Sequence, residues 1–294
     1  MYYLSFAVVL CCTAGALLWS WDYFRRYQVT RPPIGVFNLK DILLMIASII
    51  LVPYLDLVFP LWLVAGLLGL STLSLLYFAC EPILRGRWAT WLVVLALLAL
   101  DGGVTLLFGT SSNGFFAVNN AILMVVIVGI ANFWAQSGMK ARDVAVLGAF
   151  LAVYDFIATS QLPLMSNLIT RLAGLPLAPI LAWGEGGNAL GLGLGDLLFA
   201  AVFPLAMRKA FGRSAGVSAL VLVLCAMGTV LALPLKGVFP VMVVLGPLMV
   251  LQYLYWKGRY GQERTTCQYL QEEPSRQKRN LMLISNDLAG LHML

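Results

Sequence analysis

The sequence is poor in charged residues and almost free of histidine. Only 11% of its 294 residues are Asp, Glu, Lys or Arg, and 61% are hydrophobic, whereas soluble domains contain about 25% charged and about 45–50% apolar residues. These proportions exclude a soluble protein and predict a single membrane-embedded body. The sole histidine, His292, is the third residue from the end, which argues against a histidine-based zinc site, an HExxH protease and a Ser–His protease.

Cysteine is also scarce, and its spacing predicts no metal site and no disulfide. None of the five cysteines forms a CxxC pair, and four lie in or beside apolar segments, where a packing role is favoured. We therefore expect neither a metal nor another cofactor. Asn-x-Ser/Thr sequons are absent as well, which is consistent with a bacterial or archaeal membrane.

Long apolar runs occupy most of the chain and predict an all-α, polytopic membrane protein. A spanning helix needs about 20 largely apolar residues, and counting such segments gives nine transmembrane helices. The nine segments are Tyr2–Trp21, Ile42–Leu55, Pro60–Phe78, Trp88–Phe108, Phe115–Gln136, Val144–Gln161, Ala189–Met207, Gly216–Leu231 and Val238–Trp256. A long connection punctuated by Gly and Pro, Leu162–Asn188, joins the sixth segment to the seventh.

The basic residues orient these helices. All but two of the 19 Lys and Arg residues, the exceptions being Arg171 and Lys236, lie in alternate loops or after the ninth segment. Because basic loops stay on the cytoplasmic side, the N-terminus is predicted to be outside or in a lumen and the C-terminus to be cytoplasmic. The net charge of +6 is then a topology signal rather than a nucleic-acid footprint.

Two acidic residues interrupt the sixth and seventh segments, Asp155 and Asp196. A charge within the membrane costs a few kcal/mol, so each carboxylate is a candidate functional group. At 1.5 Å per residue, Asp155 lies about 9 Å before Gln161 and Asp196 about 10 Å after Ala189. If the helices are neighbours, the two carboxylates meet at one depth in the outer half of the bilayer. Such a pair shares a proton, so that one member can activate water while the other donates a proton, as in aspartic proteases.

Small residues surround Asp196. Glycines recur at intervals of four at Gly187, Gly191 and Gly195. This spacing permits close approach of membrane helices, and Gly193 and Gly195 also leave room for an extended peptide beside Asp196. A GxGD tetrapeptide alone is a weak signal, because glycine is common in membrane helices and an aspartate can merely cap one. The Tyr154–Asp155 pair one span earlier strengthens it.

A third feature is the proline-containing stretch between the eighth and ninth segments, Leu231–Pro234. Pro234 removes a backbone donor and disfavours helix at Leu233, and Gly237 and Pro240 prolong the break. Unwound backbone at membrane depth is tolerated only inside protein or against a water-filled cavity. Such a stretch can offer backbone groups to a substrate strand, or it can be a plain connecting loop.

The order of these features resembles the presenilin and signal peptide peptidase family of intramembrane aspartyl proteases. The motifs that carry the resemblance are Tyr154-Asp155, Gly193-Leu194-Gly195-Asp196 and Ala232-Leu233-Pro234. The resemblance covers the nine-helix layout and is most specific over residues 144–256. Where the family has Pro-Ala-Leu, this chain has Leu231-Ala232-Leu233, so the shape of the substrate loop is expected to differ.

The resemblance implies a catalytic pair, a substrate class and a division of the chain. Asp155 and Asp196 would be catalytic, supported by Tyr154, Gly193, Leu194 and Gly195, while Leu231, Ala232, Leu233 and Pro234 would bind substrate. Residues 1–143 would form a scaffold, 144–260 the catalytic core and 261–294 a cytoplasmic tail. The predicted orientation matches signal peptide peptidases rather than presenilins, which are inverted. The expected partners are type II transmembrane spans or remnant signal peptides, together with membrane lipid, and no nucleic acid.

Two other function classes stay open at this point. A secondary transporter would use Asp155 and Asp196 to relay protons or to bind a cation, although no inverted repeat is apparent. A prepilin peptidase-like protease shares GxGD, but its aspartates would lie at cytoplasmic helix ends. Of the remaining polar residues, Asp56 and Asp101 are expected to be interfacial or capping, and Asn132 and Gln136 to form interhelical hydrogen bonds. Asn119 and Asn120 also lie in a span.

Overall fold

The computed structural model describes residues 2–27, 29, 39–84, 86–162, 164–184, 190–233, 239–264 and 268–269. Within these ranges the chain forms ten α-helices, one π-helical turn and a two-stranded sheet. The first five helices are α1 (Tyr2–Arg26), α2 (Leu39–Val58), α3 (Leu61–Leu84), α4 (Arg87–Phe108) and α5 (Asn113–Gln136). They are followed by α6 (Ala141–Phe156), η1 (Ile157–Gln161), α7 (Leu164–Leu172), β1 (Ile180–Trp183), β2 (Leu190–Gly193), α8 (Leu194–Phe211), α9 (Arg213–Ala232) and α10 (Val241–Tyr260).

Eight of the helices are long and apolar enough to cross a membrane, namely α1 to α6, α9 and α10. This confirms the prediction of a multi-pass membrane protein. Helix α8, which holds most of the predicted seventh span, is 18 residues long and carries Asp196, Arg208 and Lys209, so its composition sets it apart from the eight. The outward faces are apolar, as lipid contact requires: Trp88, Leu106 and Leu107 of α4 are 83%, 88% and 79% exposed.

The predicted seventh helix is wrong at its start. Ala189 lies outside the described residues, Leu190–Gly193 form strand β2, and α8 begins only at Leu194. Glycine disfavours helix by about 1 kcal/mol relative to alanine, and the backbone of this stretch pairs with β1 instead. The preceding connection is also more regular than predicted, since it contains α7 and β1.

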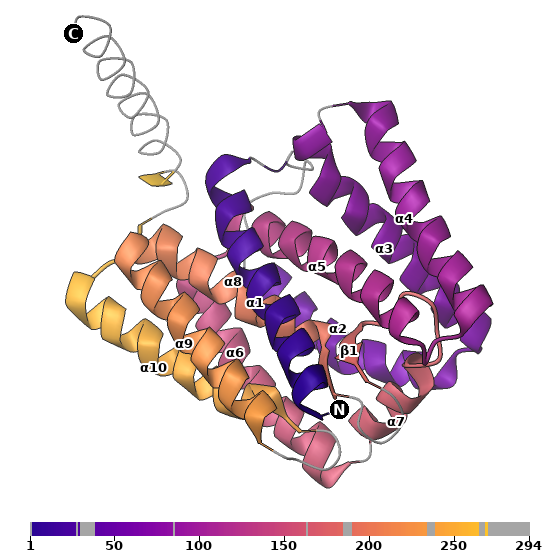
Figure 1. Cartoon of the computed structure of the whole chain (residues 1–294). Coiled ribbons are helices and arrows are strands. Elements are labelled where there is room, and N and C mark those ends of the chain that lie inside the picture. Colours follow the sequence, from indigo (N-terminus) through magenta and orange to yellow (C-terminus); the bar gives the residue numbers. More distant parts are fainter. Residues whose placement is uncertain are drawn as a thin grey trace, which may run out of the picture.

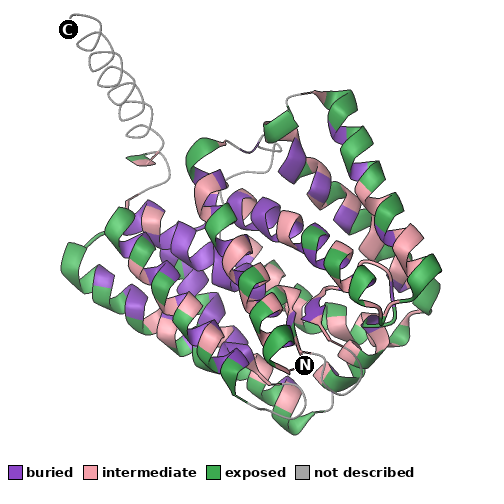
Figure 2. Ribbon diagram, in the orientation of Figure 1, coloured by how far each residue is buried: buried purple, intermediate pink, exposed green. Residues whose placement is uncertain are grey.

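Helices α5 and α8 form the centre of the bundle. Helix α5 packs against α1, α3, α4, α8 and strand β1, and α8 packs against α1, α5, α6, α9 and α10. From Leu197 to Phe211 every residue of α8 except Arg208 is buried. Figure 1 shows α3 and α4 on one side of α5, with α6, α9 and α10 on the other. Buried residues gather along α5 and α8, whereas α2 and α4 are mostly exposed (Figure 2).

The closest helix contact joins α6 and α10. A side chain added at Gly246 of α10 would clash with the Gly148 carbonyl group, and it would start only 2.9 Å from the Ala152 Cβ atom. Glycine and alanine spaced by four residues thus bring the two helices together. The expected close approach at Gly187, Gly191 and Gly195 is not found in the described residues: Gly187 lies outside them, and Gly191 is in a strand. Nothing lies within 4 Å of a side chain added at Gly195.

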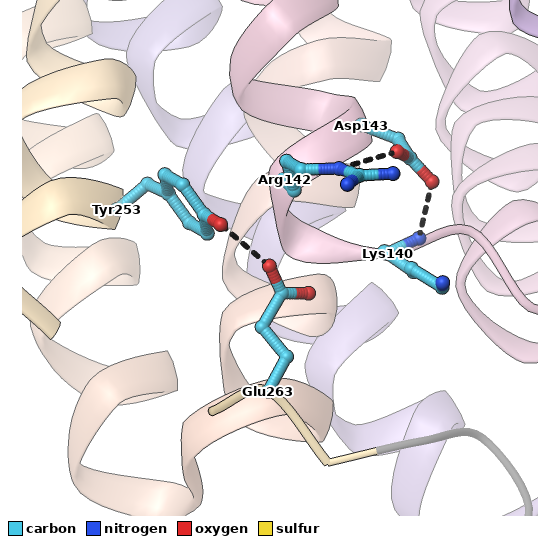
Figure 3. A network of polar contacts seen from close by, with 5 residues as sticks. All are labelled: Lys140, Arg142, Asp143, Tyr253 and Glu263. Atoms are coloured by element: carbon cyan, nitrogen blue, oxygen red, sulfur yellow. Dashed lines mark hydrogen bonds and ion pairs between the residues drawn. The ribbon is translucent and has the colours of Figure 1, made fainter. Parts of the chain in front are cut away.

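One end of the bundle, here called the basic end, gathers cationic side chains. Buried Lys209 donates to the carbonyl oxygens of Ala135 and Met139 at 2.7 and 2.6 Å, which caps the last turn of α5. Arg208 lies over the Trp21 ring, with 4.6 Å to its centroid. Figure 3 shows Tyr253 of α10 donating to Glu263 at 2.7 Å, beside the Lys140–Asp143 segment. The first residues after α10 are therefore tied to the bundle.

Candidate active site

Asp155 lies where the regular part of α6 ends. The next residues form the π-helical turn η1, a distortion found mostly at functional sites. The Thr159 hydroxyl donates to Asp155 Oδ1 at 3.3 Å, and the Met242 N–H donates to Asp155 Oδ2 at 3.2 Å. Met242 is the second residue of α10, and its N–H has no acceptor within that helix. The Asp155 carboxylate therefore accepts a hydrogen bond from an N–H group that the first turn of α10 leaves unpaired.

Asp196 lies in the first turn of α8. The N-cap residue of this helix is Gly193, and a side chain added there would start 3.4 Å from Asp196 Oδ2. Gly195 faces open space and is exposed. Leu194 joins β2 to the helix, because its N–H donates to the Pro179 carbonyl at 2.9 Å. Asp196 thus lies three residues after the end of β2, and the two neighbouring glycines, Gly193 and Gly195, add no side chains beside it.

The structure brings the two aspartates into one region. Helices α6 and α8 pack against each other, with Asp155 near the end of α6 and Asp196 in the first turn of α8. Both residues are partly exposed. Each carboxylate also lies at a helix N-terminus, that of α8 for Asp196 and that of α10 for Asp155. The arrangement places two partly exposed acidic groups in one region of the bundle.

The strand before Asp196 belongs to an antiparallel hairpin that is anchored on α5. The register pairs Leu181 with Leu192 and Ala182 with Gly191. On the other edge of β1, the side-chain amide of Asn120 both donates to the Ala182 carbonyl, at 2.8 Å, and accepts from the Ala182 N–H, at 3.0 Å. Asn120 therefore pairs with β1 as a neighbouring strand would.

Asn119 extends this anchor. Its amide nitrogen donates to the carbonyl oxygens of Ala178 and Ile180 at 3.1 and 3.2 Å. With α5 covering one edge of β1, the free edge of the described hairpin is that of β2. Because backbone groups alternate in direction along a strand, the N–H and C=O of Gly191 point outward there. This edge can accept an additional strand immediately before Asp196.

The predicted substrate stretch is only partly unwound. Leu231 and Ala232 belong to α9, one residue beyond the predicted end of the eighth segment, and the backbone leaves the helix at Leu233, where Pro234 was predicted to disfavour it; Pro234 lies outside the described residues. Helix propagation through Leu231 is permitted because the proline restricts only the residue before it. The Tyr2 hydroxyl donates to the carbonyl oxygens of Leu231 and Leu233, at 3.0 and 3.2 Å.

Tyr154, the predicted neighbour of the pair, stacks on Phe150 with ring centroids 6.1 Å apart. Its hydroxyl group is buried and has no hydrogen-bond partner among the described residues. A phenolic O–H is a donor that buried sites normally satisfy. The Tyr154 hydroxyl is therefore a hydrogen-bond donor without a partner among the described residues, and it belongs to the residue just before Asp155.

Several residues of the site were missed or misjudged from the sequence. Asn119 and Asn120 gave a signal, two consecutive amides in an apolar span, but nothing in the sequence indicated the strand they bind. Tyr2 gave none. Asp101, expected at an interface, is fully buried, although it does bind a loop N–H, that of Leu177, at 2.9 Å.

The interhelical hydrogen bond predicted for Asn132 is confirmed, whereas the hydrogen bonds of Gln136 join α5 to the chain just after α1. The Asn132 amide donates to the Ser20 carbonyl of α1 at 3.2 Å. Gln136 donates to the Tyr27 carbonyl at 3.1 Å and accepts from the Val29 N–H at 2.9 Å. Both residues therefore tie α5 to α1 and to the chain just after it.

Neither a family model nor a curated protein sequence matches this chain. Its activity has to be argued from its own residues.

Proposed function

We propose that the protein is an intramembrane aspartyl endopeptidase that hydrolyses peptide bonds within transmembrane helices. The observation that carries the proposal is the placement of two intramembrane carboxyl groups, Asp155 at the end of α6 and Asp196 at the start of α8, on packed helices beside the free edge of β2. The motif resemblance to presenilins and signal peptide peptidases supports the same assignment. The architecture would then comprise nine membrane helices, with α8 as the seventh span despite its charges.

The reaction needs two carboxyl groups, one of them protonated, and a water molecule. The ionised aspartate takes a proton from water as the oxygen adds to the scissile carbonyl carbon. The protonated aspartate gives its proton to the carbonyl oxygen, which yields a tetrahedral diol. The C–N bond then breaks, a proton passes to the leaving amine, and the pair regains its single shared proton. The Met242 N–H and the Thr159 hydroxyl both donate to Asp155 and orient it for either role.

A substrate helix has to unwind before this chemistry, because its amides are protected by their own hydrogen bonds in hydrocarbon. The outward backbone groups of Gly191 would pair with the unwound segment, so that ladder bonds replace the broken helical ones. The uncommitted Tyr154 hydroxyl is a further donor for substrate carbonyl groups. The carbonyl end of α9 around Leu233, together with the residues that follow, would hold the other side of the segment.

The expected substrates are type II spans and remnant signal peptides. This expectation rests on the basic-loop pattern, which predicts an outward N-terminus and a cytoplasmic C-terminus, and on the motif resemblance. A multi-pass protein of a bacterial or archaeal membrane would act on them within the bilayer, without a soluble partner.

The test uses the purified full chain, reconstituted in liposomes with a synthetic signal-peptide-like helix, and identifies cleavage products by mass spectrometry. Asp155→Ala and Asp196→Ala should each reduce cleavage by a factor of about 10³ or more, since each removes half of the acid–base pair. Asp56→Asn, an acid on α2 near Arg171, serves as the matched control and should cleave normally. Unreduced cleavage in either alanine variant would disprove the mechanism. Substrate that crosses the membrane uncut would instead favour the transporter class.

A further inference from the structure

Three buried oxygen atoms lie without a hydrogen-bond partner in the described part of the chain near the start of the hairpin. They are Oδ1 of Asp101, Oγ1 of Thr105 and Oδ1 of Asn119. Asp101 and Asn119 are 0% and 1% exposed. Native proteins satisfy nearly all such atoms with protein, water or an ion, so three of them in one region require an explanation.

The three residues lie at one level of two neighbouring helices. Asp101 and Thr105 are four residues apart on α4 and share one face of that helix. Helices α4 and α5 are packed neighbours joined by a short turn. Asp101 lies seven residues before the end of α4 and Asn119 six residues after the start of α5, which places them about 10 Å and about 9 Å from the turn. They therefore lie at the same level.

The other polar atoms of Asp101 and Asn119 bind the segment that enters β1. Asp101 Oδ2 accepts from the Leu177 N–H at 2.9 Å, and the Asn119 amide donates to the carbonyl oxygen of the next residue, Ala178, at 3.1 Å. Asp101 and Asn119 therefore bind neighbouring residues of one segment from two packed helices. The site is thus built from α4, α5 and the segment that enters β1.

The charge of this site is uncompensated by protein groups. Asp101 has no ion pair among the described residues, and no basic side chain acts on it. A buried carboxylate is costly unless it is paired, protonated or bound to a cation. The donor set is a carboxylate, a hydroxyl and an amide carbonyl, which are the oxygen ligands of hard cations. No three His, Cys, Asp or Glu side chains gather in the described residues, so a single negative charge matches a monovalent ion.

We propose that Asp101, Thr105 and Asn119 bind a sodium-type monovalent cation. The bound ion would neutralise Asp101 and lock the carboxylate and the Asn119 amide onto the segment that leads into β1. Since β1 pairs with β2, which precedes Asp196, ion binding would stiffen the hairpin beside the aspartate pair. The binding itself does not depend on the proposed protease activity.

The experiment compares the thermal unfolding of the purified full chain in about 150 mM NaCl and in choline chloride at equal ionic strength. A ligand that binds only the folded state raises Tm, and we expect a shift of about 2 °C or more in sodium. Asp101→Asn should abolish the shift, and Thr105→Val should reduce it. Binding of radioactive sodium to the same samples gives the second readout. If Asp101→Asn is poorly folded, sodium binding can still be compared between the unmodified chain and Thr105→Val.

Two controls separate this site from other acids. Asp56→Asn should keep the full sodium response, and so should the double variant Asp155→Asn with Asp196→Asn, whatever its cleavage activity. Equal Tm values and no sodium binding for the unmodified chain would overturn the proposal in favour of a protonated Asp101 with bridging water. A response that survives Asp101→Asn, or one that is lost in the double variant, would overturn it as well.

Discussion

Asn120 and Asn132 lie on the same helix, and each uses its amide to satisfy backbone groups of another segment. Asn120 makes two hydrogen bonds to Ala182 of β1. Asn132 makes two as well, to the carbonyl oxygens of Ser20 and Val128. Removing Asn120 leaves the buried N–H and C=O of Ala182 unsatisfied, which costs about 1–3 kcal/mol. Removing Asn132 loses one hydrogen bond between α5 and α1, which costs about 0.5–1.5 kcal/mol, because Ser20 and Val128 keep their helical partners. The two residues differ in what they hold: Asn120 fixes the hairpin that leads to Asp196, and Asn132 fixes α1.

Asn120→Ala and Asn132→Ala should therefore separate stability from activity. Both should lower the free energy of unfolding, Asn120→Ala by about 2 kcal/mol and Asn132→Ala by about 1 kcal/mol, measured by thermal or denaturant unfolding. Only Asn120→Ala should also reduce kcat/KM for helix cleavage, by about tenfold or more, which corresponds to about 1.4 kcal/mol of transition-state stabilisation. The rates are compared at a temperature at which both variants are folded. Equal activity losses in the two variants would contradict a positioning role for Asn120.

At the scale of elements, the contact of α6 with α10 determines the position of Asp155. The two helices meet at Gly148 and Gly246, and the Asp155–Met242 hydrogen bond joins them beyond that contact. Any side chain at Gly246 has to push the helices apart. Overpacking of this kind typically costs about 1–3 kcal/mol.

Gly246→Ala should consequently reduce kcat strongly, while it lowers the free energy of unfolding by only about 1–3 kcal/mol. Separation of α6 from α10 would lengthen the Met242–Asp155 hydrogen bond and displace the carboxylate from its partner, and we expect at least a tenfold loss of kcat. The matched control is Gly258→Ala on the same helix, where an added side chain meets nothing within 4 Å; it should leave kcat unchanged. Initial rates and Tm values of both variants check the prediction. Normal kcat in Gly246→Ala would show that α6 and α10 adjust independently of the site.

The membrane helices could be predicted because their signal is local and long. Each apolar run, such as that of α5, contains enough residues to identify a span without knowledge of its neighbours. The strands could not be predicted, since β1 and β2 have four residues each and their stability comes from groups distant in sequence. Asn120 lies 62 residues from Ala182, which it binds.

The two aspartates of the candidate site could be predicted from the sequence, but the packing contacts that position them could not. Asp155 and Asp196 stand out as charges in apolar segments, which the sequence shows directly. Glycine spacing did not reveal which helices pack closely: Gly191 packs against a strand and Gly195 faces open space, while isolated Gly246 makes the tightest contact among the described glycines. Spacing defines a face of a helix, but only the tertiary arrangement decides what that face meets.

At the scale of the whole molecule, the two ends of the bundle differ in chemistry. One end bears Lys140, Arg208 and Lys209, whereas the hairpin and the paired aspartates lie at the opposite end. The basic-loop pattern assigns the first end to the cytoplasm, and the proposed preference for type II spans depends on that assignment. Exposed turns at both ends, at Ser111 between α4 and α5 and at Ser214 at the start of α9, allow it to be tested.

Single cysteines at these turns should react differently with a membrane-impermeant maleimide. In a chain whose five natural cysteines are replaced by serine, Ser111→Cys should be labelled on intact cells, because the hairpin end is predicted to face outward. Ser214→Cys should be labelled only after the membrane is permeabilised, since its end is predicted to be cytoplasmic. Labelling of both variants after permeabilisation confirms that each thiol is accessible. The reverse pattern on intact cells would invert the proposed orientation, and the expected substrates would then be spans of the opposite direction, like those cut by presenilins.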